Sequence, residues 1–251
     1  NPADDGYSKV SGLFYTGDPN FNGNDYLLIT VKDGATTLAT DSLSIGVSAV
    51  NDVPTISVVG SGDSGSVTED SGATITTTGM LQISDVDTGE SKFATTPVTG
   101  SYGSLQITEG GTWTYTLNNA SVQHLKANET VDDKITVTSI DGTGSEEITV
   151  TITGTNDVPS IAGSSTATIA EGTASVGGSV TITDTDSGQS NAFVETDTQA
   201  TYGKYSVNAS GAWTYELDNS LSAVDALAVG DELTDTVTVT SADQSETKTI
   251  S

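Results

Sequence analysis

Cysteine is missing from this 251-residue sequence, which also contains only one histidine and one methionine. Without cysteine the chain can form neither a disulfide nor a thiolate zinc site, and it has no thiol nucleophile. With His124 as its single imidazole, it lacks most of the side chains that acid–base relays use. We therefore expect a protein that is not an enzyme.

Positive charge is scarce as well. The chain has 7 basic residues, all lysine, against 34 acidic ones, which gives a formal net charge of −27. Nucleic acid binding requires clustered basic residues that displace phosphate counterions, and an anionic membrane surface would repel this chain. No apolar run approaches the roughly 18 residues of a membrane span. We expect no nucleic-acid partner and no membrane insertion.

Internal repetition is the strongest positive signal in the sequence. The string NDVP occurs at residues 51–54 and again at 156–159, each time after an alternating run of Val, Ile and Thr. Between these marks SDVDTGES is matched by TDTDSGQS, TYTL by TYEL, and KITVTSIDG by TVTVTSADQ. The segment YLLITVKDG at residues 26–34 resembles the last of these pairs. The first residues, NPADDGYSKV, contain no start Met and no signal sequence. We predict a piece of a longer tandem array, with units at 1–50 (the C-terminal half of a domain), 51–155 and 156–251 (truncated at its last strand).

Within a unit the hydrophobic period is two. Trp113, Tyr115 and Leu117 share one face of a predicted strand, with threonines between them, and such alternation is typical of half-buried antiparallel strands. Around seven such runs per unit, separated by Gly, Asn, Asp and Ser, predict an all-β fold of Ig-like antiparallel β-sandwich domains arranged in a row. We expect Trp113 and Tyr115 in the core and one helical turn within residues 121–129.

Acidic residues gather where this topology would bring successive domains together. Loops that return to the start of a sandwich would place Asp85, Asp87, Glu90 and Asp141 beside the linker residues Asn51 and Asp52. The same positions in the last unit are Asn156, Asp157, Asp184, Asp186 and Asp243, and the end of the preceding unit would add Glu69 and Asp133. Carboxylates within about 6 Å repel by about 1 kcal/mol or more per pair. Ca²⁺ accepts six to eight oxygen ligands, whereas Mg²⁺ and Zn²⁺ fit this donor set less well. We predict Ca²⁺ at the linkers, with solvated acidic turns as the alternative.

The landmarks NDVP, DVD or DTD, GxWTYxL and TVTVTSxDG resemble the VCBS repeats of large secreted bacterial adhesins of the RTX type. The segment FNGNDYLLITVKDG, in residues 1–50, resembles the related cadherin-like repeats. The resemblance implies a calcium-rigidified extender of an extracellular bacterial adhesin that acts in cell adhesion or biofilm formation. It also implies that the partners are neighbouring repeats of one monomeric chain. Similarity to cadherin junctions implies ligands at Asn51, Asp52, Glu69, Asp85, Asp87, Asn156, Asp157, Asp184 and Asp186. Ala49 and Gly154 stand where those junctions would have Asp, which implies fewer ions.

Other interpretations compete with this one. The strings DTG at Asp87 and DSG at Asp186 imitate an aspartic protease pair, but the repeat places them in equivalent loops of successive domains. The string GDSG at residues 62–65 imitates a serine protease segment, which would need His124 within hydrogen-bond reach. A module that binds a sugar or a protein receptor is the main alternative function. Tyr102 and Tyr202 are the candidates for the exposed aromatic patch that it would need.

Overall fold

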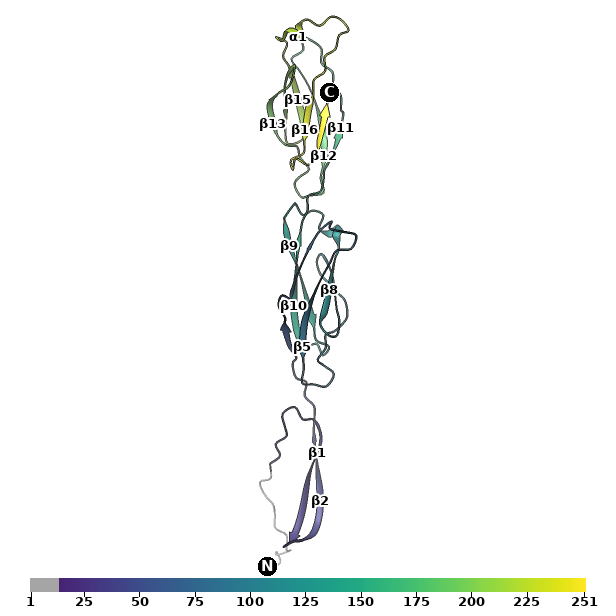
Figure 1. Ribbon diagram of the computed structural model, residues 1–251, viewed down its shortest axis with the longest axis vertical. Helices are drawn as coiled ribbons and strands as arrows, with labels where there is room; N and C mark the ends of the chain where they lie inside the picture. Colours follow the sequence, from purple (N-terminus) through teal and green to yellow (C-terminus); the bar gives the residue numbers. More distant parts are fainter. Residues whose placement is uncertain (1–13) are drawn as a thin grey trace, which may run out of the picture.

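The computed structural model describes residues 14–251, and the first thirteen residues of the expected unit 1–50 lie outside them. The chain forms a row of three bodies along one long axis (Figure 1). They are an N-terminal hairpin (residues 23–47), a middle unit (55–153) and a C-terminal unit (160–250). Residues 48–54, the first linker, and residues 154–159, the second linker, join them. Within residues 14–251 we find no helix with the length and apolar character needed to cross a bilayer.

The middle unit is a sandwich of two sheets. One sheet has the order β3-β5-β8-β7-β6 and the other β4-β10-β9. The strands are β3 (Thr55–Val58), β4 (Ser64–Thr68), β5 (Thr76–Ser84), β6 (Val98–Thr99), β7 (Gly103–Ile107), β8 (Thr112–Leu117), β9 (Thr130–Thr138) and β10 (Ser145–Thr153). Leu81, Leu105 and Trp113 from the first sheet are buried in one cluster with Ile135 and Ile148 from the second. The period of two therefore assigns the buried faces correctly, and the predicted all-β sandwich is confirmed.

The C-terminal unit repeats this arrangement with fewer paired strands. Its sheets have the orders β11-β12-β15-β14-β13 and β16-β17. The strands are β11 (Ser160–Gly163), β12 (Ser175–Thr183), β13 (Glu195–Gln199), β14 (Gly203–Val207), β15 (Ala212–Leu217), β16 (Val237–Thr240) and β17 (Thr247–Ile250). Trp213 and Tyr215 are buried in its core, at the positions that Trp113 and Tyr115 occupy in the middle unit. The predicted core role of these aromatic residues is thus confirmed.

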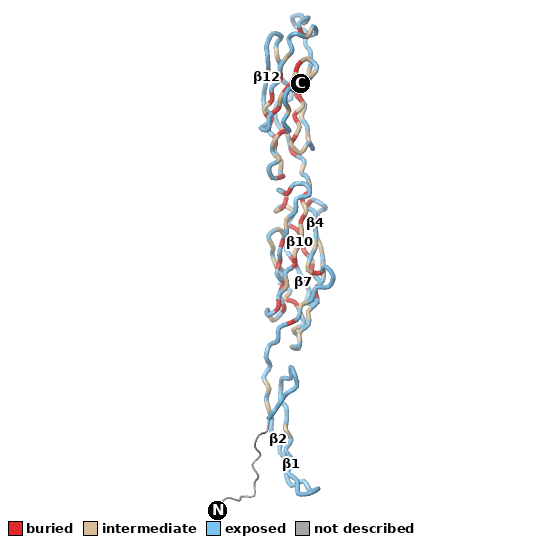
Figure 2. Tube along the Cα trace, turned by 90° about the vertical axis from the view of Figure 1, so that its left-hand side faces the viewer, coloured by how far each residue is buried: buried red, intermediate tan, exposed pale blue. Residues whose placement is uncertain are grey.

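The N-terminal hairpin pairs β1 (Gly23–Asp33) with β2 (Thr36–Val47) in an antiparallel register. Its residues are almost all exposed, whereas buried residues fill both sandwiches (Figure 2). The helical turn expected within residues 121–129 begins earlier, as the 3-10 helix η1 (Asn119–Ser121). The C-terminal unit has the short helix α1 (Ser222–Asp225) near the equivalent place.

One pairing departs from the antiparallel expectation, because β4 runs parallel to β10. The first strand of the unit is divided between the two sheets: β3 pairs with β5, and the chain then turns at residues 59–63 and continues as β4 beside β10. Gly62 lies at this crossing, where a Cβ atom would come 2.0 Å from the carbonyl oxygen of Met80. The tight crossing therefore requires glycine, and the serine protease interpretation of GDSG is unnecessary.

We predict that Gly79→Ala destabilises the middle unit. A Cβ at residue 79 would lie 2.4 Å from Cζ2 of Trp113, and the buried indole is held in place by its 2.6 Å hydrogen bond to the Gly62 carbonyl. Overpacking of this kind costs about 1–3 kcal/mol. Denaturant unfolding measures it, with Gly110→Ala as the control, because no atom lies within 4 Å of a Cβ at Gly110. Equal free energies of unfolding for the two variants would contradict the prediction.

Candidate functional site

The NDVP string forms the start of each sandwich, and its Asn, Asp and Pro residues each have a distinct contact. The amide nitrogen of Asn51 donates to the Asp52 carbonyl and to Oδ2 of Asp141, both at 3.0 Å. The backbone N–H of Asp52 donates to Oδ2 of Asp87 at 2.7 Å. Pro54 is buried beside Gly144. The motif thus ties the linker to two acidic loops of the unit that follows it.

Asp85, Asp87, Glu90 and Asp141 surround this first linker, and with Asn51 and Asp52 they form what we call the first junction. Carboxylate oxygens of Asp85, Glu90 and Asp141 lie within 4.8 Å of one another. Oδ2 of Asp85 and Oε2 of Glu90 are buried and have no hydrogen-bond partner among the described residues. Burial raises the pKa of Glu90, and the charges of Asp87, Asp141 and Asp85 raise it further. Hydrogen bonds from Ser139, Thr143 and Asn51 hold the pKa of Asp141 well below its usual range.

The second linker repeats these contacts. Asn156 donates from its amide nitrogen to the Asp157 carbonyl at 3.0 Å and to Oδ2 of Asp243 at 2.9 Å. The N–H of Asp157 donates to Oδ2 of Asp186 at 3.1 Å, and the N–H of Asp186 donates to Oδ1 of Asp184 at 2.9 Å. Gln189 occupies the position that Glu90 has in the first junction. Both linkers therefore use one local construction, with one carboxylate fewer in the second.

At the second linker the preceding unit also takes part. Glu69, just after β4, is fully buried and accepts a 2.7 Å hydrogen bond from the Thr155 N–H at Oε1. The N–H of Ser187, in the loop after Asp186, donates to the His124 carbonyl at 3.0 Å. We call Glu69, Asn156, Asp157, Asp184, Asp186 and Asp243 the second junction. It combines residues of two sandwiches and their linker.

The carboxylates of the second junction are buried or half-buried, and several are incompletely paired. Glu69 and Asp186 are 0% and 1% exposed. One oxygen of each, together with Oδ2 of Asp157 and Oδ2 of Asp184, is buried without a hydrogen-bond partner among the residues that the structure describes. Burying ionised carboxylates without compensation is strongly unfavourable. Carboxylate oxygens are ligands of the hard type that Ca²⁺ prefers, but among the described residues only Asp85, Glu90 and Asp141 of the first junction bring three of them within 4.8 Å of one another.

The pKa values at the second junction reflect this crowding. Burial raises the pKa of Glu69; the hydrogen bond from Thr155 opposes the increase, and the charges of Asp70, Asp157 and Asp186 add to it. Burial also raises the pKa of Asp157, with contributions from Asp70, Asp186 and Asp184. Burial raises the pKa of Asp186; the hydrogen bond from the Asp157 N–H opposes the increase, and the charges of Asp184 and Asp243 add to it. For Asp243, burial acts in the same direction, but hydrogen bonds from Ser241, Ser245 and Asn156 outweigh it and lower the pKa to about 2.

Asp133 does not lie with either junction. Its carboxylate is buried within the middle unit and accepts hydrogen bonds from Ser101 N–H, Tyr102 N–H and the Tyr115 hydroxyl at 2.8 to 2.9 Å. Asp235 makes the same contacts with Thr201, Tyr202 and Tyr215 in the C-terminal unit. All of these donors stabilise a carboxylate in the core, so Asp133 has a structural role. The recurrence of Tyr and Asp at equivalent repeat positions was the signal for it.

We predict that Asp133→Ala lowers the free energy of unfolding by several kcal/mol, because each buried donor left unpaired costs about 1–3 kcal/mol. Asp132→Ala serves as the control, since Asp132 is exposed and accepts a single hydrogen bond from the Thr151 hydroxyl. Thermal or denaturant unfolding in chelator separates the two. Comparable losses in both variants would argue against the role assigned to Asp133.

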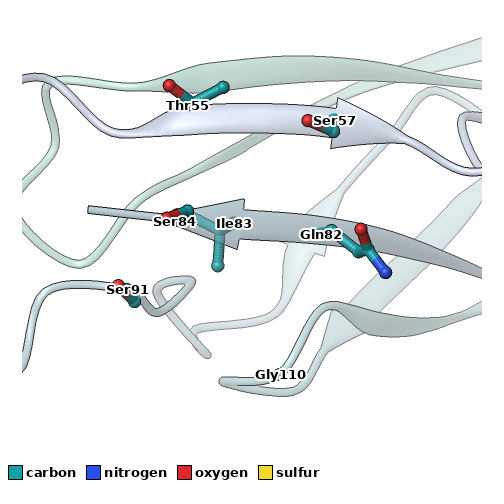
Figure 3. A pocket seen from close by; sticks show the side chains of 7 residues that line it. All are labelled: Thr55, Ser57, Gln82, Ile83, Ser84, Ser91 and Gly110. Atoms are coloured by element: carbon teal, nitrogen blue, oxygen red, sulfur yellow. The ribbon is translucent and has the colours of Figure 1, made fainter. Parts of the chain in front are cut away.

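The residues considered for receptor binding or catalysis have less structural support than the two junctions. Tyr102 is half-buried and packs against the core of the middle unit, so it does not form an exposed aromatic patch. A pocket of about 280 Å³ lies over β3 and β5 (Figure 3). Its lining residues are Thr55, Ser57, Gln82, Ile83, Ser84, Ser91 and Gly110, none of them aromatic or charged. Asp87 and Asp186 lie in separate sandwiches and cannot share a proton as a protease pair would.

Comparison with known proteins gives one family. The model of the "Bacterial cadherin-like domain" family matches residues 51–155 and again residues 156–251. No curated protein matches the sequence. Among solved structures, cadherin domains 1–4 of protocadherin gamma B7 are 20% identical, with a TM-score of 0.44, over 91% of this chain and 57% of that one. Domains 1–3 of mouse PcdhgC3 are 16% identical, with a TM-score of 0.41, over 90% of this chain and 74% of that one. This chain therefore spans a little more than half of the gamma B7 structure.

Proposed function

Because this chain belongs to the bacterial cadherin-like domain family, we propose that it is an extender segment of a secreted bacterial surface adhesin, stiffened at its linkers by Ca²⁺. The observation that carries the proposal is the second junction, where four buried carboxylate oxygens from two sandwiches and their linker have no partner among the described residues. A divalent cation would neutralise that charge and join both units to the linker. Without it, mutual repulsion would favour separation of the two units.

The ligand atoms available at the junctions determine which ion we propose. Carboxylates, an asparagine amide and backbone carbonyls offer oxygen only, which suits Ca²⁺. Glu69, Asp157, Asp184 and Asp186 would hold an ion at the second junction. Asp85, Glu90 and Asp141, together with Asp52 and Asp87, would do so at the first. Asn51, Asn156 and Asp243 fix the linker through hydrogen bonds and are secondary candidates.

The wider proposal concerns the parent protein. The NDVP, DVD and WTY landmarks support repeats of the VCBS type in an adhesin of the RTX type, with domain boundaries at 51–155 and 156–251 and a partial cadherin-like repeat before them. Such a segment would act outside the cell as a monomeric spacer whose partners are neighbouring repeats. Extracellular calcium modules bind at about 10⁻⁴–10⁻³ M, so the linkers would stiffen after export. A role in cell adhesion or biofilm formation follows from this spacer function.

The first test measures the second junction alone. Because the chain lacks cysteine, single cysteines at the exposed positions Thr136 and Thr181 can carry spin labels on either side of the linker. We expect a broad distance distribution in chelator and a narrow one with about 5 mM Ca²⁺. Glu69→Gln should keep the distribution broad. Glu171→Gln, at the equivalent but exposed position of the next unit, should behave like the unaltered chain. A distribution that calcium does not change would refute the proposal.

Calcium should also stabilise the fold. At about one hundred times the dissociation constant, a ligand that binds only the native state adds about 2.7 kcal/mol per site. We expect calorimetric scans to show a rise in melting temperature with Ca²⁺ for the unaltered chain and a reduced rise for Glu69→Gln. In chelator the same variant should be more stable than the unaltered chain, because it removes one buried negative charge. Lower stability of Glu69→Gln in chelator would contradict this electrostatic explanation.

Lowering the pH should change the stability of the fold in opposite directions with and without Ca²⁺. The pKa values of Glu69, Asp157 and Asp186 are raised in the folded state, so the stabilisation from their protonation is lost as the pH rises through those values. In chelator, stability should therefore increase as the pH falls from 7.5 towards 5. With Ca²⁺ it should decrease, since protons compete for the ligands. Asp243 would not interfere, because its lowered pKa of about 2 places its titration below this window. Urea unfolding at the two pH values measures both slopes, and slopes of equal sign would exclude the model.

A further inference from the structure

A short segment of the middle unit, residues 124–129, contacts both the second linker and the C-terminal unit. It lies between η1 and β9, and Leu125 anchors it in the core of the middle unit, where this side chain is buried. The His124 carbonyl accepts the 3.0 Å hydrogen bond from the Ser187 N–H, which belongs to the loop that contains Asp186. Because both partners are main-chain groups, neither pH nor a bound ion alters their charge.

The same segment holds the start of the second linker. The Gly154 N–H donates to the Glu129 carbonyl at 2.7 Å, and the Asn128 N–H donates to the Gly154 carbonyl at 3.0 Å. A Cβ atom at Gly154 would lie 2.4 Å from the Lys126 carbonyl oxygen and 2.6 Å from Cβ of Leu125, so any side chain there would displace the segment. Gly154 stands where similarity to cadherin junctions implies Asp, and backbone contacts occupy the space that such a side chain would need.

The N–H of Ser187 belongs to a tight turn, residues 186–189, and the middle unit has the matching turn at residues 87–90. Each turn is closed by a 3.2 Å hydrogen bond from the N–H of its last residue to the carbonyl of its first, and the third residue of each is a glycine with positive φ. The counterpart of Ser187 is Thr88, whose N–H has no hydrogen-bond partner among the described residues. The turn therefore forms without the contact to the preceding unit, and that contact is a separate feature of the second linker.

We propose that residues 124–129 form an ion-independent latch that positions the Asp186 loop against the end of the middle unit. The latch opposes the repulsion between Glu69 and Asp186, so carboxylates from both sandwiches are already close together before an ion binds. Such preorganisation reduces the ordering cost of binding. This last step rests on the proposed function, whereas the latch itself consists of backbone groups. Ser187 is a positioning residue, because it acts on the ion only through the loop that contains Asp186.

The first test measures the latch in the unaltered chain. Amide hydrogen exchange, followed by NMR in chelator and corrected for the intrinsic rate of each sequence, compares Ser187 with Thr88. The Ser187 amide should exchange more slowly by a factor of about two to ten, which is what one hydrogen bond contributes. Equal protection of the two amides would overturn the proposal, and this result needs no substitution.

The second test removes the hydrogen bond and keeps the turn. Proline is favoured at the second position of a turn of this kind, so Ser187→Pro deletes the donor to His124 without opposing the turn. Thr88→Pro makes the same change where no hydrogen bond is lost, and Ser187→Ala keeps the N–H. With spin labels at positions 136 and 181 in chelator, only Ser187→Pro should broaden the distance distribution further. Circular dichroism checks that each variant is folded. A distribution that Ser187→Pro leaves unchanged would refute the latch.

Calcium titration separates the latch from the proposed function. Isothermal titration calorimetry should show that Ser187→Pro weakens Ca²⁺ binding by about two- to tenfold, the cost of one lost hydrogen bond, while Thr88→Pro leaves the affinity at the second junction unchanged. Saturating Ca²⁺ should still narrow the distance distribution of Ser187→Pro. Equal affinities of the Ser187→Pro and unaltered chains would overturn the positioning role. If Ca²⁺ binds neither chain, the proposed function fails, whereas the comparison in chelator still decides whether the latch exists.

Discussion

Repulsion between buried carboxylates at the second linker is the constraint on which the rest of the molecule depends. Glu69 and Asp186 come from different sandwiches and are excluded from water, and the charge of Asp186 contributes to the raised pKa of Glu69. The hydrogen bonds of the linker align their loops, but they leave one oxygen of each unpaired. Under the proposed function, charge would control the angle between the two units, and a bound cation would change a repulsive contact into an attractive one. A row of domains joined in this way would respond to its ionic surroundings at each such linker.

The two linkers differ in the contacts that they receive from the preceding body. The second receives Glu69 and a direct backbone contact from His124 to Ser187, whereas the described contacts of the first linker come from the linker itself and the middle unit. In place of a buried glutamate from the preceding body, the first junction has the trio of Asp85, Glu90 and Asp141. Gln189 removes the equivalent of Glu90 from the second. If the linkers bind ions as proposed, the number of ions need not be equal, even though the NDVP strings are identical.

Sequence patterns predict the sandwiches well because each β-strand alternates between core and solvent, and because the repeat shows every landmark twice. The sequence patterns also place Asp85, Asp87 and Asp141 near the linker, because the order of the strands determines which loops lie at the same end of a sandwich. Asp133 shows where this reasoning fails. Its assignment depends on the Tyr115 hydroxyl and two N–H groups of residues 101 and 102, contacts that only the folded chain brings together. The parallel course of β4 was missed for a similar reason, because a strand that changes sheets has the same alternation as one that does not.

The parallel pair of β4 and β10 has a mechanical consequence. These strands lie near the two ends of the middle unit's chain, and they run along the long axis of the row (Figure 2). Tension transmitted through the two linkers would pull them in opposite directions along their own lengths. Their five registered residue pairs would then be loaded together in shear, instead of opening one after another as in peeling. If the chain acts as the proposed spacer, it would resist unfolding best when it is pulled end to end.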